Sequence, residues 1–237
     1  MKPPSTPGSL HPAQMRILQA LSLTQYSTFS SLQKSTGLTS DHVNFHIKRL
    51  LAKEYVKHVP KSYGKYALSE AGKHFANMFS PDDLTLEEQP KVSVVLWVTD
   101  KQGRLLRQER LQQPFYGYWT RPTGKVRRGE TIIQAATRKL KEETGLTANL
   151  KVIGVEHRID KTESNELLED KYLFIVEGTN PSGTFITNNE KANNHWVSEA
   201  EYADKEKRFG KVRSESTPSN STISFTEDNY VFDEQDY

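Results

Sequence analysis

The chain of 237 residues contains no cysteine. Without thiols it cannot form a disulfide, bind a metal through thiolates or use a cysteine nucleophile. It also lacks a long apolar run. Residues 1–10, MKPPSTPGSL, have Pro and Ser where a signal peptide needs apolar residues, and no later stretch is long enough to span a membrane. These absences predict a soluble, cytoplasmic protein without a membrane partner.

A strong net charge is absent as well, because 32 basic side chains nearly balance 30 acidic ones. The charges are unevenly distributed, however. Residues 1–80 contain ten Lys and Arg against three acidic residues, whereas residues 214–237 contain six acidic residues and no basic one. An excess of positive charge is typical of a surface that binds a polyanion, although lysines that only maintain solubility explain it as well.

The length predicts two domains, each large enough to bury its own core. Residues 81–90 are polar and end in a proline, which predicts a linker between a first domain at 11–80 and a second at 91–210. Residues 1–10 are expected to be a flexible N-terminus. Residues 211–237, rich in Ser and Thr and then in Asp and Glu, are expected to form a mobile acidic tail.

The first domain begins with helical patterns. Residues 12–21 carry apolar side chains at helical spacing behind a proline that suits the first helical position. A second helix is expected near 29–34. After a turn at Gly37, Thr39 or Ser40 is expected to cap a third helix, whose apolar residues face inward.

A hairpin follows the third helix. Residues 55–59 and 66–68, separated by a Pro-Lys-Ser-Tyr-Gly turn, predict two strands, and a last helix is expected from Ser69 through Phe79. This order resembles the winged helix-turn-helix of small bacterial and archaeal regulators, specifically in SDHVNFHIKRLLAKEYV and YALSEAG. The resemblance covers about residues 11–80. It implies that the third helix enters the major groove of double-stranded DNA and that the hairpin contacts the backbone.

The residues expected to contact DNA lie on the exposed side of the third helix or on the hairpin. They are Ser40, His42, Asn44, Phe45, His46, Lys48, Lys61 and Lys65. The histidines and the asparagine offer hydrogen bonds to base edges, and the lysines neutralise phosphates. A domain that serves only protein docking or dimerisation is the open alternative, and a homodimer is kept as a candidate assembly.

The most specific pattern lies in the second domain, at residues 124–146, GKVRRGETIIQAATRKLKEETGL. Thr131 begins a capping box at the start of a helix, and Gly145 suits the left-handed turn at its end. Glu142 and Glu143 therefore lie in the last turn. The helix dipole and their mutual repulsion favour a bound cation, and oxygen-only ligands favour Mg²⁺ or Mn²⁺.

The spacing resembles the Nudix box, G-x5-E-x7-R-E-U-x-E-E-x-G-U, at every defined position but one, where this chain has Lys139. The resemblance implies that Glu142 and Glu143 bind the metal, that the metal neutralises a diphosphate, and that Glu130 and Arg138 brace the loop. These four residues form the expected catalytic set. In many family members the position of Lys139 holds a glutamate that binds metal or deprotonates the attacking water.

Lys139 changes the expected chemistry. It stands three residues before Glu142 and four before Glu143, so its ammonium group can pair with either carboxylate and compete with a metal. The sequence does not select a replacement for the missing general base. The candidate substitutes are Glu163, Glu166, Glu169 and Glu190.

Basic residues precede and enter the box. Arg121, Lys125 and Arg127, with Arg128 beside them, would attract a polyphosphate through charge-assisted hydrogen bonds, while a basic rim without a ligand is the alternative. The aromatic residues within 115–119 suit either stacking on a base or a place in the core or a domain interface.

Further strands are expected at 92–98, 104–110, 151–158, 171–177 and 194–198. The expected fold is α+β, with an N-terminal winged helix-turn-helix followed by a Nudix-type α/β/α sandwich with a mixed sheet. The leading functional interpretation is a Mg²⁺-dependent Nudix hydrolase of a nucleoside diphosphate linked to another moiety, carrying a DNA-binding domain. The alternatives are a transcriptional regulator whose degenerate Nudix domain binds a nucleotide-type ligand without cleaving it, and a scaffold with neither activity.

Overall fold

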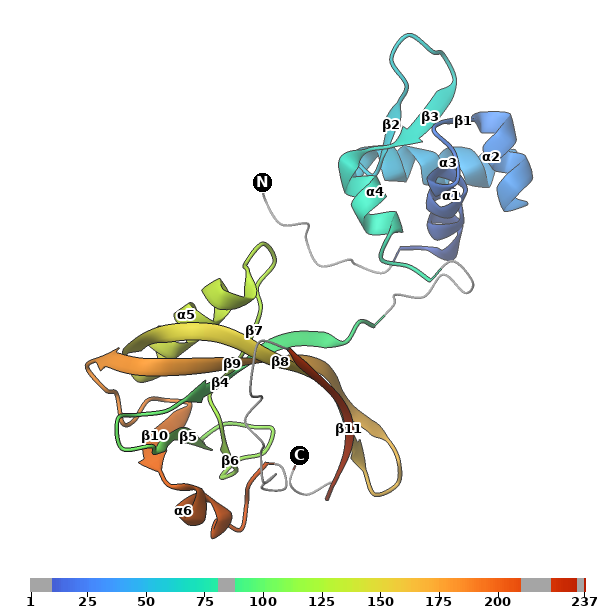
Figure 1. Cartoon of the computed structure of the whole chain (residues 1–237). Coiled ribbons are helices and arrows are strands. Elements are labelled where there is room, and N and C mark those ends of the chain that lie inside the picture. Colours follow the sequence, from blue (N-terminus) through green and yellow to red (C-terminus); the bar gives the residue numbers. More distant parts are fainter. Residues whose placement is uncertain (1–9, 81–87, 210–222, 234–236) are drawn as a thin grey trace. The chain divides into compact units, whose positions relative to one another are not determined.

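The computed structural model describes residues 10–80, 88–209, 223–233 and 237 (Figure 1). The chain divides into two compact units, Met1–Gln89 and Pro90–Tyr237. Most of the linker expected at 81–90 and nearly all of the expected flexible N-terminus lie outside the described residues. Leu10 is buried, so the first unit begins to pack at this residue.

The first unit consists of short helices and a small sheet. Its elements are, in order, α1 (Pro12–Ser22), β1 (Ser27–Thr28), α2 (Phe29–Thr36), α3 (Ser40–Ala52), β2 (Val56–His58), β3 (Lys65–Leu68) and α4 (Glu70–Ala76). The strands form an antiparallel sheet in the order β1-β3-β2. The last helix ends at Ala76 rather than at the expected Phe79, whose ring instead packs against Phe75 from outside the helix.

Local side-chain contacts set where these helices begin and end. His11 starts α1 with a capping box, and the hydroxyl groups of Thr28 and Ser69 accept hydrogen bonds from the first turns of α2 and α4. Gly37 ends α2 with a φ of 65°, a conformation that favours glycine. Short-range sequence therefore determines the helix boundaries of this unit.

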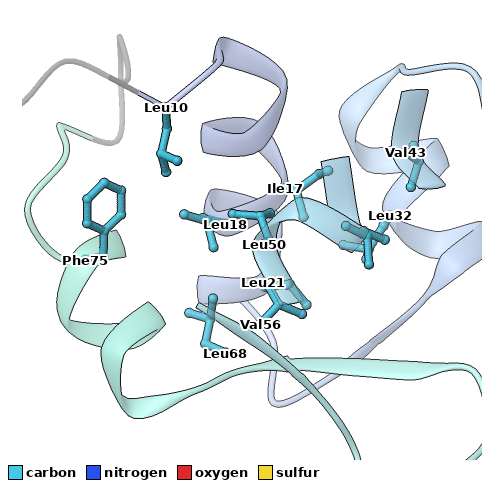
Figure 2. Packing of buried hydrophobic residues seen from close by; sticks show 11 residues of the cluster. Leu10, Ile17, Leu18, Leu21, Leu32, Val43, Leu50, Val56, Leu68 and Phe75 are labelled. Carbon is cyan, nitrogen blue, oxygen red and sulfur yellow. The ribbon is translucent and has the colours of Figure 1, made fainter. Parts of the chain in front are cut away.

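The core of the first unit is formed by apolar side chains from the four helices and the hairpin (Figure 2). The buried residues include Ile17, Leu18, Leu21, Leu32, Val43, Leu50, Val56, Leu68 and Phe75. Burying one such side chain contributes about 1.5–3 kcal/mol relative to leaving it exposed. Gly72 permits the last helix to pack closely, because a Cβ atom there would lie 1.8 Å from the carbonyl oxygen of Tyr55.

The described part of the second unit contains two sheets and one long helix. Its elements are β4 (Lys91–Val98), β5 (Leu105–Arg110), β6 (Trp119–Thr120), β7 (Thr123–Lys125), α5 (Ile132–Thr144), β8 (Leu146–Thr162), β9 (Leu167–Gly183), β10 (Ala192–Val197), α6 (Glu199–Ala203) and β11 (Ser224–Phe232). The larger sheet has the order β11-β8-β9-β4-β7 and the smaller one β10-β5-β6. The larger sheet is mixed, because β4–β9 and β11–β8 are parallel pairs and the others antiparallel.

Strand β4 separates the core from the functional side of this unit. Its side chains alternate between the two faces of the sheet. Val94, Leu96 and Val98 join the core beneath α5, whereas Ser93, Val95 and Trp97 line a basin. Within the described residues the remaining helix, α6, has only five residues, so the expected α/β/α sandwich has one full helix layer.

Strands β8 and β9 are each 17 residues long, far longer than the strands expected at 151–158 and 171–177. They pair with each other from Leu146–Gly183 to Lys161–Leu167, with bulges that shift the register. The residues that extend them beyond the expected ranges include charged, Gly, Asn and Pro residues, as in 178–183, so no regular apolar alternation marks them in the sequence, although Asp160 and Thr162 are buried. Pairing between the two strands extends them.

The expectation of a mobile tail at 211–237 is wrong for residues 223–233. These residues include β11, which adds to the edge of β8 as a parallel strand. The Tyr230 hydroxyl donates to Glu156 at 3.1 Å, and the ring of Phe232 packs 4.8 Å from that of Phe115. These contacts attach β11 to the rest of the second unit, although the composition of this segment is polar. Residues 210–222 and 234–236 lie outside the described residues.

No helix in the described part of the chain has both the length and the apolar character that a membrane crossing requires.

Candidate active site

Helix α5 has the boundaries that its motif predicts. The Thr131 hydroxyl accepts a hydrogen bond from the backbone N–H of Gln134, and the Gln134 side chain accepts one from Thr131. At the other end Gly145 has a φ of 72°, and a Cβ atom there would lie 2.1 Å from the carbonyl oxygen of Thr184. Glycine is thus required both by the turn and by the close approach of the following chain.

Glu130 and Arg138 are in direct contact. Arg138 donates from Nε to Oε1 at 2.6 Å and from Nη2 to Oε2 at 2.8 Å, and Nη2 also reaches the carbonyl oxygen of Lys125 at 3.1 Å. The backbone N–H of Arg127 donates to Glu130 at 2.9 Å. The bonds from Arg138 and then from Arg127 lower the pKa of Glu130 to about 2. The pair ties the loop that precedes α5 to the middle of the helix.

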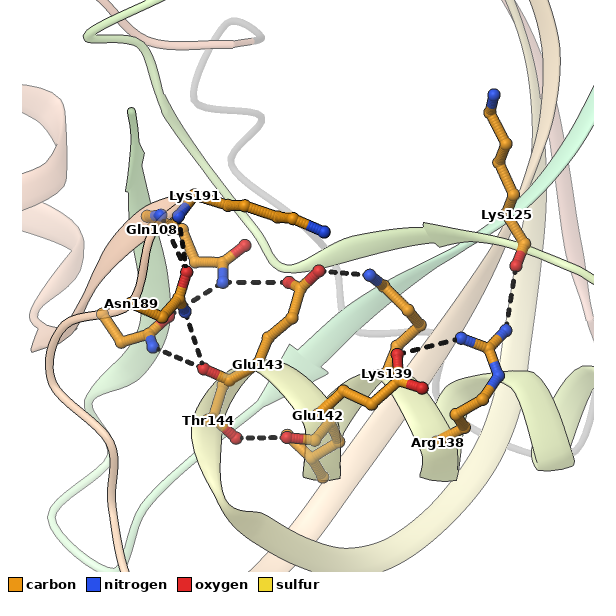
Figure 3. A network of polar contacts seen from close by, with 12 residues as sticks. Gln108, Lys125, Arg138, Lys139, Glu142, Glu143, Thr144, Asn189 and Lys191 are labelled. Carbon is orange, nitrogen blue, oxygen red and sulfur yellow. Dashed lines mark hydrogen bonds and ion pairs between the residues drawn. The ribbon is translucent and has the colours of Figure 1, made fainter. Parts of the chain in front are cut away.

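Glu142 lies beside two guanidinium groups. Arg138 Nη1 donates to Glu142 Oε2 at 3.2 Å (Figure 3). Arg127 Nη2 lies 3.6 Å from Oε1. The carboxylate is 45% exposed, so solvent weakens both ion pairs. Arg127, expected to bind substrate, is instead directed at this carboxylate.

Glu143 is more buried, and both of its carboxylate oxygens have partners (Figure 3). Lys139 donates to Oε1, and Gln108 Nε2 donates to Oε2 at 3.0 Å. The side chains of Lys139 and Glu143 are only 16% and 17% exposed. Of the two carboxylates within its reach, the lysine therefore pairs with Glu143.

Three amides from other strands and loops hold Glu143. Asn189 and Asn194 donate to its carbonyl oxygen at 3.0 and 2.8 Å, and Gln108 also donates to Asn194 Oδ1 at 2.8 Å. No motif in the sequence points to these amides. An asparagine inside an expected strand is the signal that could have revealed Asn194, which is 1% exposed.

Gly124 makes room for Lys139. A Cβ atom at Gly124 would lie 2.2–2.4 Å from Cε, Cγ and Cδ of the lysine. Gly124 has no positive φ, so this close approach, rather than its backbone conformation, accounts for the glycine. Strand β7 therefore passes against the side chain of Lys139 and fixes its path toward Glu143.

The resemblance to the Nudix box implies a divalent metal on Glu142 and Glu143. In this structure the two carboxylates are already paired with protein cations, namely Arg127, Arg138 and Lys139. No three His, Cys, Asp or Glu side chains of the described ranges lie together in a group that could hold a metal ion. The residues present do not fit a metal site in this arrangement, because a metal would have to displace these ion pairs.

A basin of about 1710 Å³ opens beside the box, and Lys139 and Glu143 lie in its wall. Strands of both sheets contribute to its lining, including β4, β8, β9 and β11 of the larger sheet and β5 of the smaller one. Among the described residues, ten Lys and Arg side chains and six Asp and Glu side chains line it. This excess of positive charge favours an anionic ligand.

Two of the three residues expected to bind substrate, Arg121 and Lys125, line the basin. The guanidinium group of Arg121 lies 4.2 Å from the ring centroid of Trp97, a distance typical of a cation–π contact. Arg110, which lies outside the box, also lines the basin. Burial lowers the pKa of Arg110, so this partly desolvated cation would gain from a bound anion.

The residues that line the basin limit which carboxylate can act as the general base. Three of the four candidate replacements for the missing glutamate do not line it: Glu163, Glu166 and Glu190. Glu169 does line it, but it forms ion pairs with Lys91 and Lys171. Burial raises the pKa of Glu169, yet the bonds from the two lysines outweigh this effect and lower the value to about 2. Such a carboxylate is a weak base.

The aromatic residues before the box mostly belong to the interior. Phe115 and Tyr118 are 3% and 8% exposed, and the rings of Phe209 and Phe232 pack 4.8 Å from Phe115. Tyr116 is 57% exposed. The packing therefore favours the core alternative over base stacking for Phe115 and Tyr118.

In the first unit, the expected DNA contacts on α3 are exposed with one exception. The exposed residues are Ser40, His42, Asn44, Phe45 and Lys48. His46 is not on the exposed side as expected, because its ring is 7% exposed and stacks on His11 with centroids 4.7 Å apart. It follows Val43 at a spacing of three residues and so lies on the inner face of the helix. Burial lowers the pKa of His46.

Of the two hairpin lysines expected to contact DNA, one is exposed to solvent. Lys61 is exposed, whereas Lys65 is half buried and its ammonium group lies 4.1 Å from the ring centroid of Tyr26. Tyr63, between the two strands, is fully exposed.

Comparisons with known proteins identify the second unit. The model of the NUDIX domain matches residues 89–218, more than half of the chain, and confirms the resemblance carried by the box. An ADP-ribose pyrophosphatase of Methanocaldococcus jannaschii is 32% identical over 82 residues, which are 34% of this chain. The chain spans about half the length of that curated relative, 48%.

Solved structures of MutT and Nudix proteins also match. A MutT Nudix hydrolase from Burkholderia pseudomallei is 26% identical, with 46% of this chain and 84% of that chain covered and a TM-score of 0.41. A MutT protein from Bacillus halodurans is 23% identical, with 47% and 70% covered and a TM-score of 0.41. A Nudix hydrolase from Nitrosomonas europaea is 19% identical, with 64% and 86% covered and a TM-score of 0.43.

Proposed function

The chain belongs to the Nudix domain family, and we propose that its second unit hydrolyses a nucleoside diphosphate linked to another moiety. The observation that carries this proposal is the cationic basin, because its wall includes Lys139 and Glu143 of the box. A diphosphate is an anion that such a surface attracts. ADP-ribose is the first compound to test, since the curated relative is named for its hydrolysis.

The geometry suggests distinct roles for the lining residues. Arg121 and Lys125 are proposed to bind the diphosphate, with Arg110 as an additional cation. Glu130 and Arg138 are proposed to hold the loop that borders the basin. These are positioning and binding roles, and they leave the activation of water unassigned. Turnover is therefore expected to be slow, because a general base typically contributes about 10² to 10⁴-fold.

The test is a substrate screen with the purified full chain. Nudix hydrolases generally use Mg²⁺ or Mn²⁺, so ADP-ribose, other nucleoside diphosphate conjugates and nucleoside triphosphates are incubated with each ion and the products separated by chromatography. Hydrolysis of ADP-ribose would release AMP and ribose 5-phosphate. The Arg121→Met, Lys125→Met double variant removes two of the proposed diphosphate contacts, so it serves as the control and should lose most of the activity. Absence of turnover for every diphosphate, with the folded protein, contradicts the proposal.

A second candidate function is a sensor that binds a nucleotide-type ligand without cleaving it. The specific observation in its favour is the ion pair between Lys139 and Glu143, which occupies one carboxylate of the box. Binding without turnover in the same screen would select this function. Lys139→Glu would then be expected to gain hydrolysis, because it restores the missing carboxylate.

For the first unit we propose a winged helix that binds double-stranded DNA. The exposed His42, Asn44 and Lys48 on α3, and Lys61 on the hairpin, support this proposal. Several phosphate contacts would make the affinity fall steeply with salt. The Lys48→Glu, Lys61→Glu double variant should weaken binding to all sequences, whereas Asn44→Ala should change the preference among them.

Lys73 provides the matched control for the DNA experiment. It is exposed on α4, outside the proposed contact surface, so Lys73→Glu changes the net charge without changing that surface. Its effect on retardation should be small. If the wild-type chain shows no retardation at low salt and selection from random DNA enriches no sequence, the first unit is a docking module instead.

A further inference from the structure

Lys139 is a cation held inside the box, at the position where the motif has a glutamate. We propose that its ammonium group takes the place of the divalent cation and binds the diphosphate of the ligand directly, so that ligand binding requires no metal. The proposal rests on the proposed function only for the class of ligand. It concerns how the charge of that ligand is neutralised.

The position of Lys139 supports a direct contact. The residue lines the basin, and its side chain is 16% exposed, so the ammonium group has already lost much of its hydration. Gly124 on one side and Glu143 at the end fix its path. Because an ammonium group has three N–H donors and Glu143 accepts one of them, donors remain for phosphate oxygens.

The charges of the box lead to the same conclusion. Three carboxylates, those of Glu130, Glu142 and Glu143, are paired with three cations that include Lys139. The group is therefore neutral. With a glutamate at position 139 the same group would have a net charge of minus two, which one divalent cation neutralises. The lysine thus supplies the charge for which a metal would otherwise be needed.

Two further lysines can complete the binding of a diphosphate. Lys125 and Lys191 also line the basin. Among the described residues, no carboxylate lies within ion-pair distance of either ammonium group. The diphosphate can therefore be held by side-chain cations alone.

Calorimetry on the full chain tests the proposal. The probe is the α,β-methylene analogue of ADP-ribose, which cannot be hydrolysed at the diphosphate, titrated once in EDTA and once in Mg²⁺. Wild type should bind with the same Kd in both. Lys139→Met should weaken binding about tenfold to a hundredfold in both, as expected for the loss of a hydrogen bond to a charged group. Lys139→Glu should bind only in Mg²⁺.

Two variants serve as controls. Lys139→Arg keeps the positive charge and should retain binding in EDTA, which separates loss of charge from loss of fold. Lys151→Met removes an exposed lysine of β8 that does not line the basin and should leave the Kd unchanged.

The outcomes separate this inference from the proposed function. If wild type binds the analogue only in Mg²⁺, or Lys139→Met binds as tightly as wild type, then Lys139 does not replace the metal, and the proposed function stands. If wild type binds neither the analogue nor inorganic pyrophosphate in either buffer, the ligand class itself is wrong and both proposals fail together.

Discussion

Replacing Gly124 with alanine should expel Lys139 from its place in the box. The new Cβ atom would lie 2.2–2.4 Å from Cε, Cγ and Cδ of the lysine, whereas carbon atoms in contact prefer about 3.5–4.0 Å. The backbone tolerates alanine, since Gly124 has no positive φ. The lysine must therefore leave its present rotamer and its ion pair with Glu143.

The change in the free energy of unfolding caused by Gly124→Ala is the sum of two opposing effects. Inserting a methyl group into a filled space typically costs about 1–3 kcal/mol. Alanine also restricts the unfolded chain more than glycine does, which returns about 0.4–1 kcal/mol. We expect Gly124→Ala to lower the free energy of unfolding of the second unit by about 1–2 kcal/mol. Binding of the methylene analogue in EDTA should weaken as it does in Lys139→Met.

A double-mutant cycle isolates the contact. In Lys139→Ala the three overlapping atoms are absent, so adding Gly124→Ala should be neutral or stabilise by up to about 1 kcal/mol. The coupling free energy between the two sites should be about 1–3 kcal/mol. All three tryptophans, Trp97, Trp119 and Trp196, belong to the second unit, so urea unfolding followed by tryptophan fluorescence reports on that unit.

An equal cost of Gly124→Ala in the wild-type and Lys139→Ala backgrounds would refute the proposed contact. That result would mean that the methyl group meets something other than Lys139. A second contrary result would be a destabilised Gly124→Ala variant that keeps full affinity in EDTA, because the displaced lysine would then not be a ligand contact.

Three further predictions concern titration and packing. Bonds to Glu227 and then to Asp170 raise the pKa of His157, so its contribution to stability is complete below about 6.5, the unfolded value, and is lost as pH rises through the folded pKa. The difference in urea midpoint between wild type and His157→Gln should therefore shrink toward pH 9, and a constant difference would contradict the assignment. The lowered pKa of Glu130, about 2, makes its contribution complete above about 4.5 and lost as pH falls through 2, so acid unfolding curves of wild type and Glu130→Gln should converge at the acid end. His46→Ala should destabilise the first unit by about 1–3 kcal/mol, measured by far-UV circular dichroism, and an unchanged midpoint would show that the ring is not packed.

Local sequence predicts the helix ends and the contacts between residues that are close together in the chain. The ends of α5 follow from Thr131 and Gly145, whose caps involve residues only a few positions away. Glu130 and Arg138 meet because the turn and the first helical turns bring them together over eight residues. The reach of Lys139 to a carboxylate four residues ahead follows from helix geometry alone.

Periodicity was less reliable for single positions. Ile133 stands three and seven residues before the buried Ala136 and Leu140, a spacing that predicts burial, but it is 38% exposed, while Ile132 packs against the core. His46 shows the opposite error, since a polar side chain expected outside lies on the inner face of α3. At the border of the apolar face of a helix, periodicity does not distinguish between two adjacent residues. Only packing against a neighbouring element decides which of the two side chains is buried.

Tertiary structure alone decided what surrounds the box. Gln108, Asn189 and Asn194 reach Glu143 from positions 35 to 51 residues away. Strand β11 adds a wall to the basin because β8 offers an unpaired edge, although the composition of that segment predicts a mobile tail. The sequence by itself determined the motif, its helix and the presence of a lysine in place of a glutamate. Which carboxylate the lysine neutralises, and that it lies in a cationic basin, depended on strands distant in the chain, because backbone pairing between such strands is set by the whole fold and not by local pattern.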